Sequence, residues 1–153
     1  MANYSCKTRT NYFSVTDEVK FRKIMASCWG SDEVIVFDEN QDDGSAKYGF
    51  LCSGSIYGLA DCDKGCDTCN PSVCEDEDIE HNYDAFCEAL QEILPEGEAI
   101  VITESGSEAM RYLVGDCMVI TRSGYKGICV KREALKVAAA MLNNPGFTTK
   151  MDY

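Results

Sequence analysis

Apolar and β-branched residues gather in four short runs between residues 97 and 130. The runs are Ala99–Thr103, Met110–Val114, Cys117–Thr121 and Tyr125–Val130, and the breaks between them are Ser105–Ser107, Gly115–Asp116 and Ser123–Gly124. Small, turn-forming residues of this kind let a strand reverse within two or three positions. The pattern therefore predicts an antiparallel meander of four strands.

Shorter apolar runs before the meander predict three more strands. Arg9–Val15 carries aromatic and β-branched residues, and Glu33–Phe37 is a compact apolar run. The next run, Ala46–Cys52, follows an acidic turn, so the last two strands are expected to form a hairpin with an acidic tip. The segment Ser53–Leu59 either extends that strand or forms a bulge.

Apolar residues recur at helical spacing in three segments. The first predicted helix is capped by Thr16 or Asp17 and ends at Gly30, where glycine favours a helix stop. The second begins near Asp78. The third runs from about Arg132 to Asn143, and its spacing predicts a buried stripe made of Leu135, Ala138, Ala139 and Leu142.

The predicted elements follow the order β-α-β-β-(loop)-α-β-β-β-β-α. The first six match the βαββαβ order of a ferredoxin-like half. At 153 residues the chain has the usual length of one domain. We therefore expect a single α+β domain over residues 1–153, with a mixed, mostly antiparallel sheet, helices packed on one face, a ferredoxin-like first half, and a Cys-rich acidic loop at 60–80.

The sequence predicts a cytoplasmic protein that does not associate with a membrane. No apolar run approaches the roughly 20 residues that cross a bilayer. The N-terminal segment MANYSCKTRTNYF also lacks the apolar stretch of a secretion signal. In a reducing compartment, ten cysteines favour metal ligands, small buried hydrophobes or the free thiols of an anaerobic organism.

The formal net charge of -12 is unevenly placed. Residues 32–80 hold fourteen Asp and Glu against two Lys, whereas the rest of the chain balances twelve against twelve. This argues against direct binding of nucleic acid, which needs a basic face, and favours a basic protein partner. The residues expected to bind that partner are Asp38, Glu39, Asp42, Asp43, Glu75, Asp76, Glu77 and Asp78. The simpler interpretation of the same charges is a solvated loop that maintains solubility.

Four cysteines lie within thirteen residues, with the spacing C-x3-C-x2-C-x4-C. They are Cys62, Cys66, Cys69 and Cys74, with Cys52 and His81 as substitute ligands. Four thiolates are enough for a tetrahedral zinc site, although only one pair has the tight two-residue gap. Free thiols and a disulfide remain the alternatives. The first three also match the cluster motif of radical S-adenosylmethionine enzymes, but the chain lacks the length and βα alternation of that class.

Catalytic motifs are scarce. The single histidine leaves no histidine-based metal cage, and no glycine-rich nucleotide-binding motif occurs. Aspartates beside the cysteine cluster disfavour a reactive thiolate. We therefore expect a non-enzymatic protein with no catalytic residues, and a thiol enzyme is the weakest alternative. The main alternative is a small zinc or iron-sulfur binding protein with a structural loop of four cysteines.

The chain carries the stretches RTNYFSVTDEVKF at Arg9–Phe21, EAMRYLVGDCMVITRSG at Glu108–Gly124 and PGFTTKMDY at Pro145–Tyr153. Together they resemble a group of small uncharacterised proteins carried by phages and conjugative elements of anaerobic gut Firmicutes. The resemblance implies a setting, because mobile elements often encode compact acidic proteins that disable host defence nucleases. The expected function is therefore inhibition of a CRISPR effector or a restriction enzyme, with carboxylates that imitate the charges of a nucleic-acid backbone.

Overall fold

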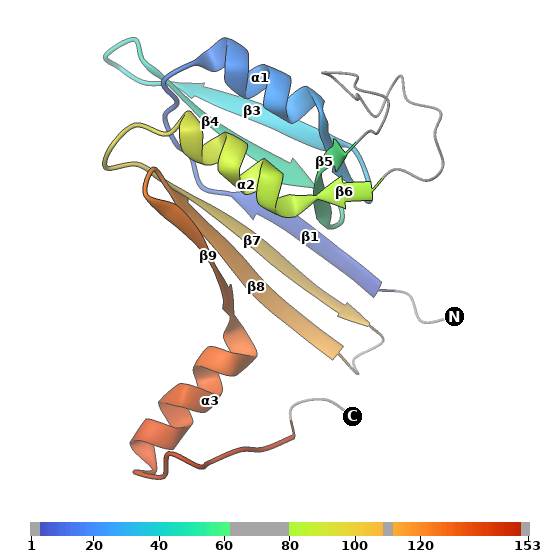
Figure 1. Ribbon diagram of the computed structural model, residues 1–153, viewed down its shortest axis with the longest axis vertical. Helices are drawn as coiled ribbons and strands as arrows, with labels where there is room; N and C mark the ends of the chain where they lie inside the picture. The colour runs from blue at the N-terminus through green and yellow to red at the C-terminus, as the bar shows by residue number, and fades with distance from the viewer. Residues whose placement is uncertain (1–3, 62–79, 109–111, 151–153) are drawn as a thin grey trace.

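The computed structural model describes residues 4–61, 80–108 and 112–150 (Figure 1). Its main element is a six-stranded sheet. The strands are β1 (Tyr4–Thr10), β3 (Val34–Asn40), β4 (Ala46–Cys52), β7 (Ala99–Glu108), β8 (Tyr112–Thr121) and β9 (Gly124–Cys129). Their order across the sheet is β3-β4-β1-β7-β8-β9, and every neighbouring pair is antiparallel.

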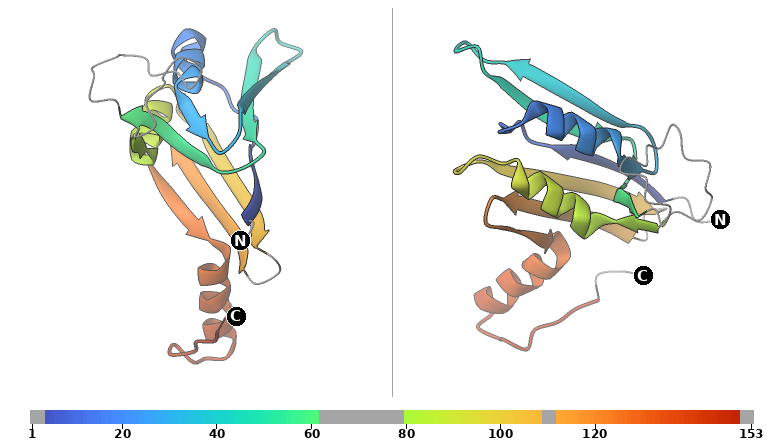
Figure 2. Two further views of the ribbon diagram at one scale, coloured as in Figure 1. Left: turned by 90° about the vertical axis from the view of Figure 1, so that its right-hand side faces the viewer. Right: turned by 45° about the horizontal axis from the view of Figure 1, so that its top comes forward.

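Two helices, α1 (Glu18–Ala26) and α2 (Tyr83–Glu92), lie side by side on one face of this sheet (Figure 1). A second, three-stranded antiparallel sheet consists of β2 (Cys28–Gly30), β5 (Ile56–Asp61) and β6 (Glu80–Asn82). Because β2 follows α1 and β6 precedes α2, the small sheet continues the helical layer (Figure 2).

The hydrophobic core fills the space between the large sheet and the two helices. Phe50 from β4 lies at its centre and is fully buried. Its ring packs edge-on against Phe13 and Phe86, with centroid distances of 6.2 and 5.9 Å. Phe13 in turn packs against Phe21 of α1 at 5.6 Å. Burial of these rings supplies much of the hydrophobic stabilisation that holds the helices on the sheet.

The meander has three strands, so the prediction of four is wrong. Strand β7 continues through Ser105–Ser107, and β8 continues through Gly115–Asp116. Gly106 marks a close approach of two strands, because a Cβ at this position would lie 2.5 Å from the Cβ of Cys6 on β1. The break at Ser123–Gly124 is confirmed as the turn between β8 and β9.

The first half of the chain agrees with the predictions in part. The range predicted for β4 and the Asp17 cap of α1 are confirmed, and an Asp17 carboxylate oxygen accepts the Lys20 N–H at 2.9 Å. The first strand lies earlier than predicted, because the chain turns inward after β1 to bury Phe13. The helix ends before Gly30 because β2 begins at Cys28, and Ser53–Leu59 leads into the separate strand β5.

The α+β class, with a mostly antiparallel sheet and three helices, is confirmed. The ferredoxin-like first half is not confirmed, because β2, β5 and β6 interrupt the βαββαβ order and form a sheet of their own. Apart from these short strands, the chain order is β1-α1-β3-β4-α2-β7, and the corresponding order across the sheet is β3-β4-β1-β7.

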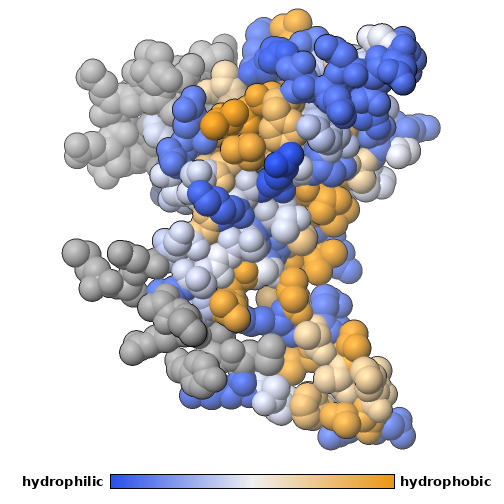
Figure 3. Space-filling view, turned by 180° about the vertical axis from the view of Figure 1, so that it is seen from behind, coloured by the Kyte–Doolittle hydropathy of each residue, from blue (hydrophilic) through white to orange (hydrophobic). Residues whose placement is uncertain are grey.

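The third helix, α3 (Val130–Met141), contacts β8 and β9 and projects away from the other two helices (Figures 1 and 2). None of its residues is buried, so the predicted packing of this helix on the sheet is wrong. The predicted stripe is half-buried at Leu135, Ala138 and Ala139 and exposed at Leu142. Helix α3 follows β9, the edge strand of the large sheet, and no other described element covers the helix there. Figure 3 shows apolar side chains gathered at this end of the molecule.

None of the helices in the described parts of the chain is long and apolar enough to cross a membrane.

Candidate functional site

Four of the predicted partner-binding carboxylates lie on the hairpin formed by β3 and β4. Asp38 and Glu39 end β3, Asp42 and Asp43 lie in the turn, and all four are exposed. The turn is well fixed, because an Asp43 carboxylate oxygen accepts both the N–H and the hydroxyl of Ser45, at 2.9 and 2.6 Å. The Ser45 hydroxyl, and then its N–H, lower the pKa of Asp43. The side chain is therefore held as a carboxylate.

Three basic residues near this hairpin form ion pairs with other carboxylates, while a fourth, Arg9, stacks on the Phe37 ring of β3 at 5.0 Å from its centroid. Arg22 and Lys47 still attract Asp38 and Asp43, respectively, at longer range. The ion pairs are Lys20–Glu92 at 2.6 Å, Arg22–Glu18 at 2.9 Å and Lys47–Glu98 at 3.7 Å. Lys47 is the register partner of Glu39, yet its ammonium lies within pairing distance of Glu98. Within the described residues, the four hairpin carboxylates therefore form no ion pair. Figure 3 shows this corner of the molecule as a hydrophilic surface.

The other predicted partner-binding residues, Glu75, Asp76, Glu77 and Asp78, lie outside the described residues. The strands that flank them, β5 and β6, lie at the opposite end of β3 and β4 from the hairpin turn (Figures 1 and 2). The hairpin is therefore a charged surface in its own right.

The predicted metal ligands Cys62, Cys66, Cys69 and Cys74 also lie outside the described residues. Of the two substitute ligands, Cys52 is buried and its thiol donates to the Asp32 carbonyl at 3.4 Å. His81 is exposed on β6, where its ring packs against Trp29 and Tyr57. No cluster of three or more metal-ligating side chains occurs in the part of the chain that the structure describes.

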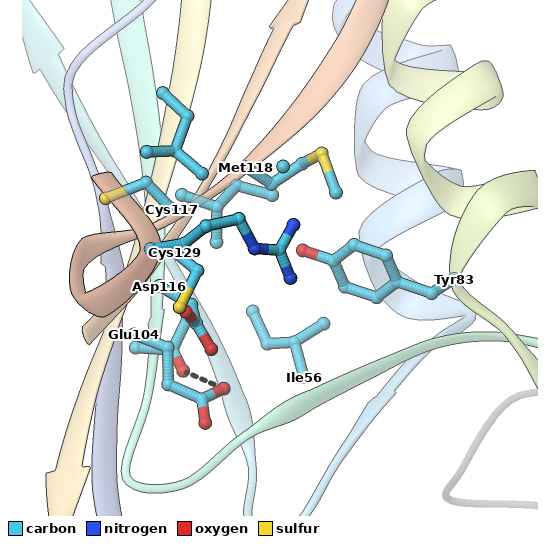
Figure 4. A pocket seen from close by; sticks show the side chains of 12 residues that line it. Ile56, Tyr83, Glu104, Asp116, Cys117, Met118 and Cys129 are labelled. Carbon is cyan, nitrogen blue, oxygen red and sulfur yellow. Dashed lines mark hydrogen bonds between the residues drawn. The ribbon is translucent and has the colours of Figure 1, made fainter. Parts of the chain in front are cut away.

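A second candidate site is a cavity of about 370 Å³ on the helical side of the large sheet (Figure 4). Strands β1, β7, β8 and β9 form its floor, Ile56 of β5 and Tyr83 of α2 face the sheet across it, and Arg132 of α3 also lines it. Burial raises the pKa of Tyr83, so its hydroxyl remains protonated. The site thus combines parts of the chain that are far apart in sequence.

A polar row crosses the floor of this cavity. Thr8, Glu104, Asp116 and Cys129 are successive register partners on four adjacent strands. Residues directly opposite each other in an antiparallel sheet share one face, so the two acidic side chains stand next to each other. Figure 4 shows them on the sheet side of the cavity.

The carboxylate of Glu104 is held mainly by two hydroxyl groups. Tyr4 donates to it at 2.8 Å and Ser55 at 3.0 Å, whereas the Thr8 hydroxyl lies 3.4 Å away and makes a shorter bond of 2.7 Å to the Gly54 carbonyl. Figure 4 marks one of these bonds by a dashed line. The bond from Glu104 raises the pKa of the Tyr4 hydroxyl, after the larger effect of burial. Glu104 is thus fixed in direction before any ligand arrives.

The sequence does not predict this cavity, because the pattern at Gly115–Asp116 indicates a turn. The signal that could have found it is the alternation of side chains along a strand. Ile102 and Glu104 share a face on β7, and Met118 and Asp116 share the same face on β8. On each strand an inward-facing apolar residue lies two positions from an inward-facing acid.

Comparison of the chain with protein-family models, curated proteins and solved structures gives no match. The fold and the two surfaces define an acidic α+β protein with a charged hairpin and a small cavity. One fold can serve many functions, so the chemistry of these two surfaces says more about function than the fold does.

Proposed function

We propose that the protein is a non-enzymatic acidic binding protein of a mobile genetic element. It inhibits a host defence nuclease, of the anti-CRISPR or anti-restriction type, by occupying a basic nucleic-acid-binding surface. The observation that supports this proposal is the β3–β4 hairpin, which presents four exposed carboxylates that form no ion pair with another described residue.

The distribution of charge around the hairpin suits a groove better than a flat surface. Asp38 lies on the helical face of the sheet, opposite Tyr48, whereas Glu39 lies on the other face, opposite Lys47. Asp42 and Asp43 add charge at the turn between them. The hairpin is therefore acidic on both sides and at its tip, and it complements a groove with two basic walls.

The physical basis of inhibition is competition for the same basic residues. A nucleic-acid groove carries lysines and arginines that neutralise phosphates, and carboxylates of complementary arrangement engage the same groups. The charge of the protein also accelerates the encounter with a basic partner. Both effects are screened by salt, so inhibition should weaken as ionic strength rises.

The test compares two variants with the same change in net charge. The hairpin variant combines Asp38→Asn, Glu39→Gln, Asp42→Asn and Asp43→Asn. The control variant combines Glu33→Gln, Glu80→Gln, Glu88→Gln and Glu96→Gln, which are exposed glutamates on other parts of the molecule. DNA binding and cleavage by candidate CRISPR effectors and restriction enzymes are measured with each protein at low and high salt.

We expect the unaltered protein and the control variant to inhibit a nuclease, and the hairpin variant to lose most of this inhibition. If inhibition weakens equally in both variants, it depends on net charge alone, and the hairpin is not the binding surface. Absence of inhibition by the unaltered protein at low salt would contradict the proposed function.

A further inference from the structure

The cavity of Figure 4 is lined by two adjacent carboxylates and one arginine, so the charged groups of its lining sum to a negative charge. Glu104 and Asp116 are direct register partners, and neither forms an ion pair with a lysine or arginine in the described parts of the chain. Like charges directly opposite each other on neighbouring strands destabilise a sheet. The pair is therefore maintained at a cost in folding free energy, and a bound cation would offset that cost.

The rest of the lining includes aliphatic side chains. Ile56 lies across the cavity from the acids, and Ile102 and Met118 lie beside them on the floor. Ligand sites typically combine mostly apolar walls with a few oriented polar groups. An inorganic cation would leave this apolar surface unused, and the described residues provide no cluster of three metal-ligating side chains. The lining therefore favours a cation with an organic body.

We propose that this cavity binds a small organic cation, an amine carried on a short apolar body. The ammonium group lies between the carboxylates of Glu104 and Asp116, and the apolar body packs against Ile56. A volume of about 370 Å³ lies near the lower end of the range for ligand cavities, which is about 300–1,000 Å³, so the ligand is small.

Two features of the lining determine selectivity. The hydroxyl groups of Tyr4 and Ser55 keep Glu104 in one direction, so little ordering is required when the ligand binds. Arg132, in the first turn of α3, also lines the cavity and carries the same charge as the ligand. Its guanidinium therefore opposes a simple amine and sets an upper limit to the affinity.

The first test is a titration followed by NMR and calorimetry, with four probes matched in size or charge. Hexylamine carries both the cation and the apolar body. Hexan-1-ol and hexanoate replace the cation by a neutral and an anionic group, and methylamine lacks the body. We expect hexylamine to bind at least about tenfold more tightly than the alcohol, because hydrogen bonds to charged groups are the stronger ones. Methylamine should also bind more weakly, because each buried methylene adds to affinity.

The second test uses variants of the lining. Asp116→Asn and Glu104→Gln should each weaken hexylamine binding at least about tenfold, whereas Arg132→Gln should strengthen it. The combined hairpin variant Asp38→Asn, Glu39→Gln, Asp42→Asn and Asp43→Asn is the control and should bind hexylamine as the unaltered protein does. This control distinguishes binding in the cavity from a general attraction of amines to an acidic protein. The nuclease inhibition by the hairpin variant is measured separately, so failure of amine binding and failure of inhibition can be told apart.

Three results would each overturn the inference. The first is no binding of hexylamine to the folded protein at millimolar concentration. The second is equal binding of hexan-1-ol, which would identify an apolar site without charge recognition. The third is unchanged hexylamine binding in both carboxylate variants. Asp116 is exposed, so its variant should fold even if Glu104→Gln disturbs the hydroxyl network.

Discussion

Glu104 and Asp116 face each other as register partners on β7 and β8, at the floor of the cavity. Because like charges in this position repel, we predict that Asp116→Asn stabilises the folded protein by less than about 1 kcal/mol. Urea unfolding measures the change. Added salt should reduce the difference, since it screens the repulsion in the unaltered protein.

The control for this change is Glu133→Gln on α3. Glu133 accepts a charged hydrogen bond from Lys136 at 2.6 Å, so its neutralisation should not stabilise the protein. If both variants gain stability equally, the gain comes from the reduced net charge and the local repulsion is negligible.

The turn of the acidic hairpin depends on the ionised form of Asp43. Hydrogen bonds from the Ser45 hydroxyl and N–H lower the pKa of this carboxyl. A group with a lowered folded-state pKa stabilises the fold above its unfolded pKa, near 3.9 for Asp, and this contribution is lost as pH falls through the folded pKa. We predict that an NMR titration finds Asp43 below the ordinary Asp value, and that Ser45→Ala raises its pKa toward that value.

Glu133 is the control in the same titration, because its pKa is also lowered, by the hydrogen bond from Lys136 on α3. Its pKa should not respond to Ser45→Ala. An equal shift at both positions would indicate a general change in the protein and would contradict the specific role of Ser45.

The sequence predicts correctly those elements that are determined by residues next to each other in the chain. The strand Ala46–Cys52 has a compact run of strand-forming residues, and the Asp17 cap acts within one helical turn, so both were found. The patterns at Gly106 and Gly115 predict turns, because the sequence does not distinguish a chain reversal from a close approach of two strands. That distinction depends on partners distant in sequence, such as Cys6 for Gly106.

For the same reason, the sequence predicts the charged hairpin but not the cavity. Asp38, Glu39, Asp42 and Asp43 are neighbours along the chain, so the sequence grouped them before the structure did. Glu104 and Asp116 are brought together only by the register of β7 and β8. Helix α3 shows the limit of periodicity, because an amphipathic stripe indicates a helix but not whether a surface is available to cover it.

The described cysteines should differ in reactivity. Burial raises the pKa of Cys28 and of Cys87 to about 12, whereas Cys117 and Cys129 are only half-buried. The thiolate is the form that reacts with alkylating reagents. We therefore predict that iodoacetamide at pH 7.5 modifies Cys117 and Cys129 before Cys28 and Cys87, as followed by peptide mass spectrometry.

The same reaction in denaturant is the control, because unfolding should bring the rates together. Rapid modification of Cys28 or Cys87 in the folded protein would reveal an activated thiol. That result would favour the thiol-enzyme alternative.

Shortening a side chain should affect the free energy of unfolding more on α2 than on α3. Leu90 of α2 is fully buried, and we predict that Leu90→Ala lowers the free energy of unfolding by about 2–5 kcal/mol. Val137 of α3 is 58% exposed, so Val137→Ala should change it by less than about 0.5 kcal/mol. Urea denaturation of both variants measures the difference. A large loss at Val137 would mean that a partner, such as a second copy of the chain, covers α3 in solution.

The spacing of Cys62, Cys66, Cys69 and Cys74 makes a separate prediction about metal content. If the four thiolates hold one zinc ion, protein purified without oxygen should contain about one equivalent of metal, because a structural zinc site takes four thiolate ligands. Elemental analysis measures this content, and less than half an equivalent would reject a structural site. The paired change Cys66→Ser and Cys69→Ser should abolish binding, whereas Cys117→Ser and Cys129→Ser should not. Retention of the metal in the first pair would assign it to other ligands, and removal of metal without loss of nuclease inhibition would show that the loop and the acidic hairpin act independently.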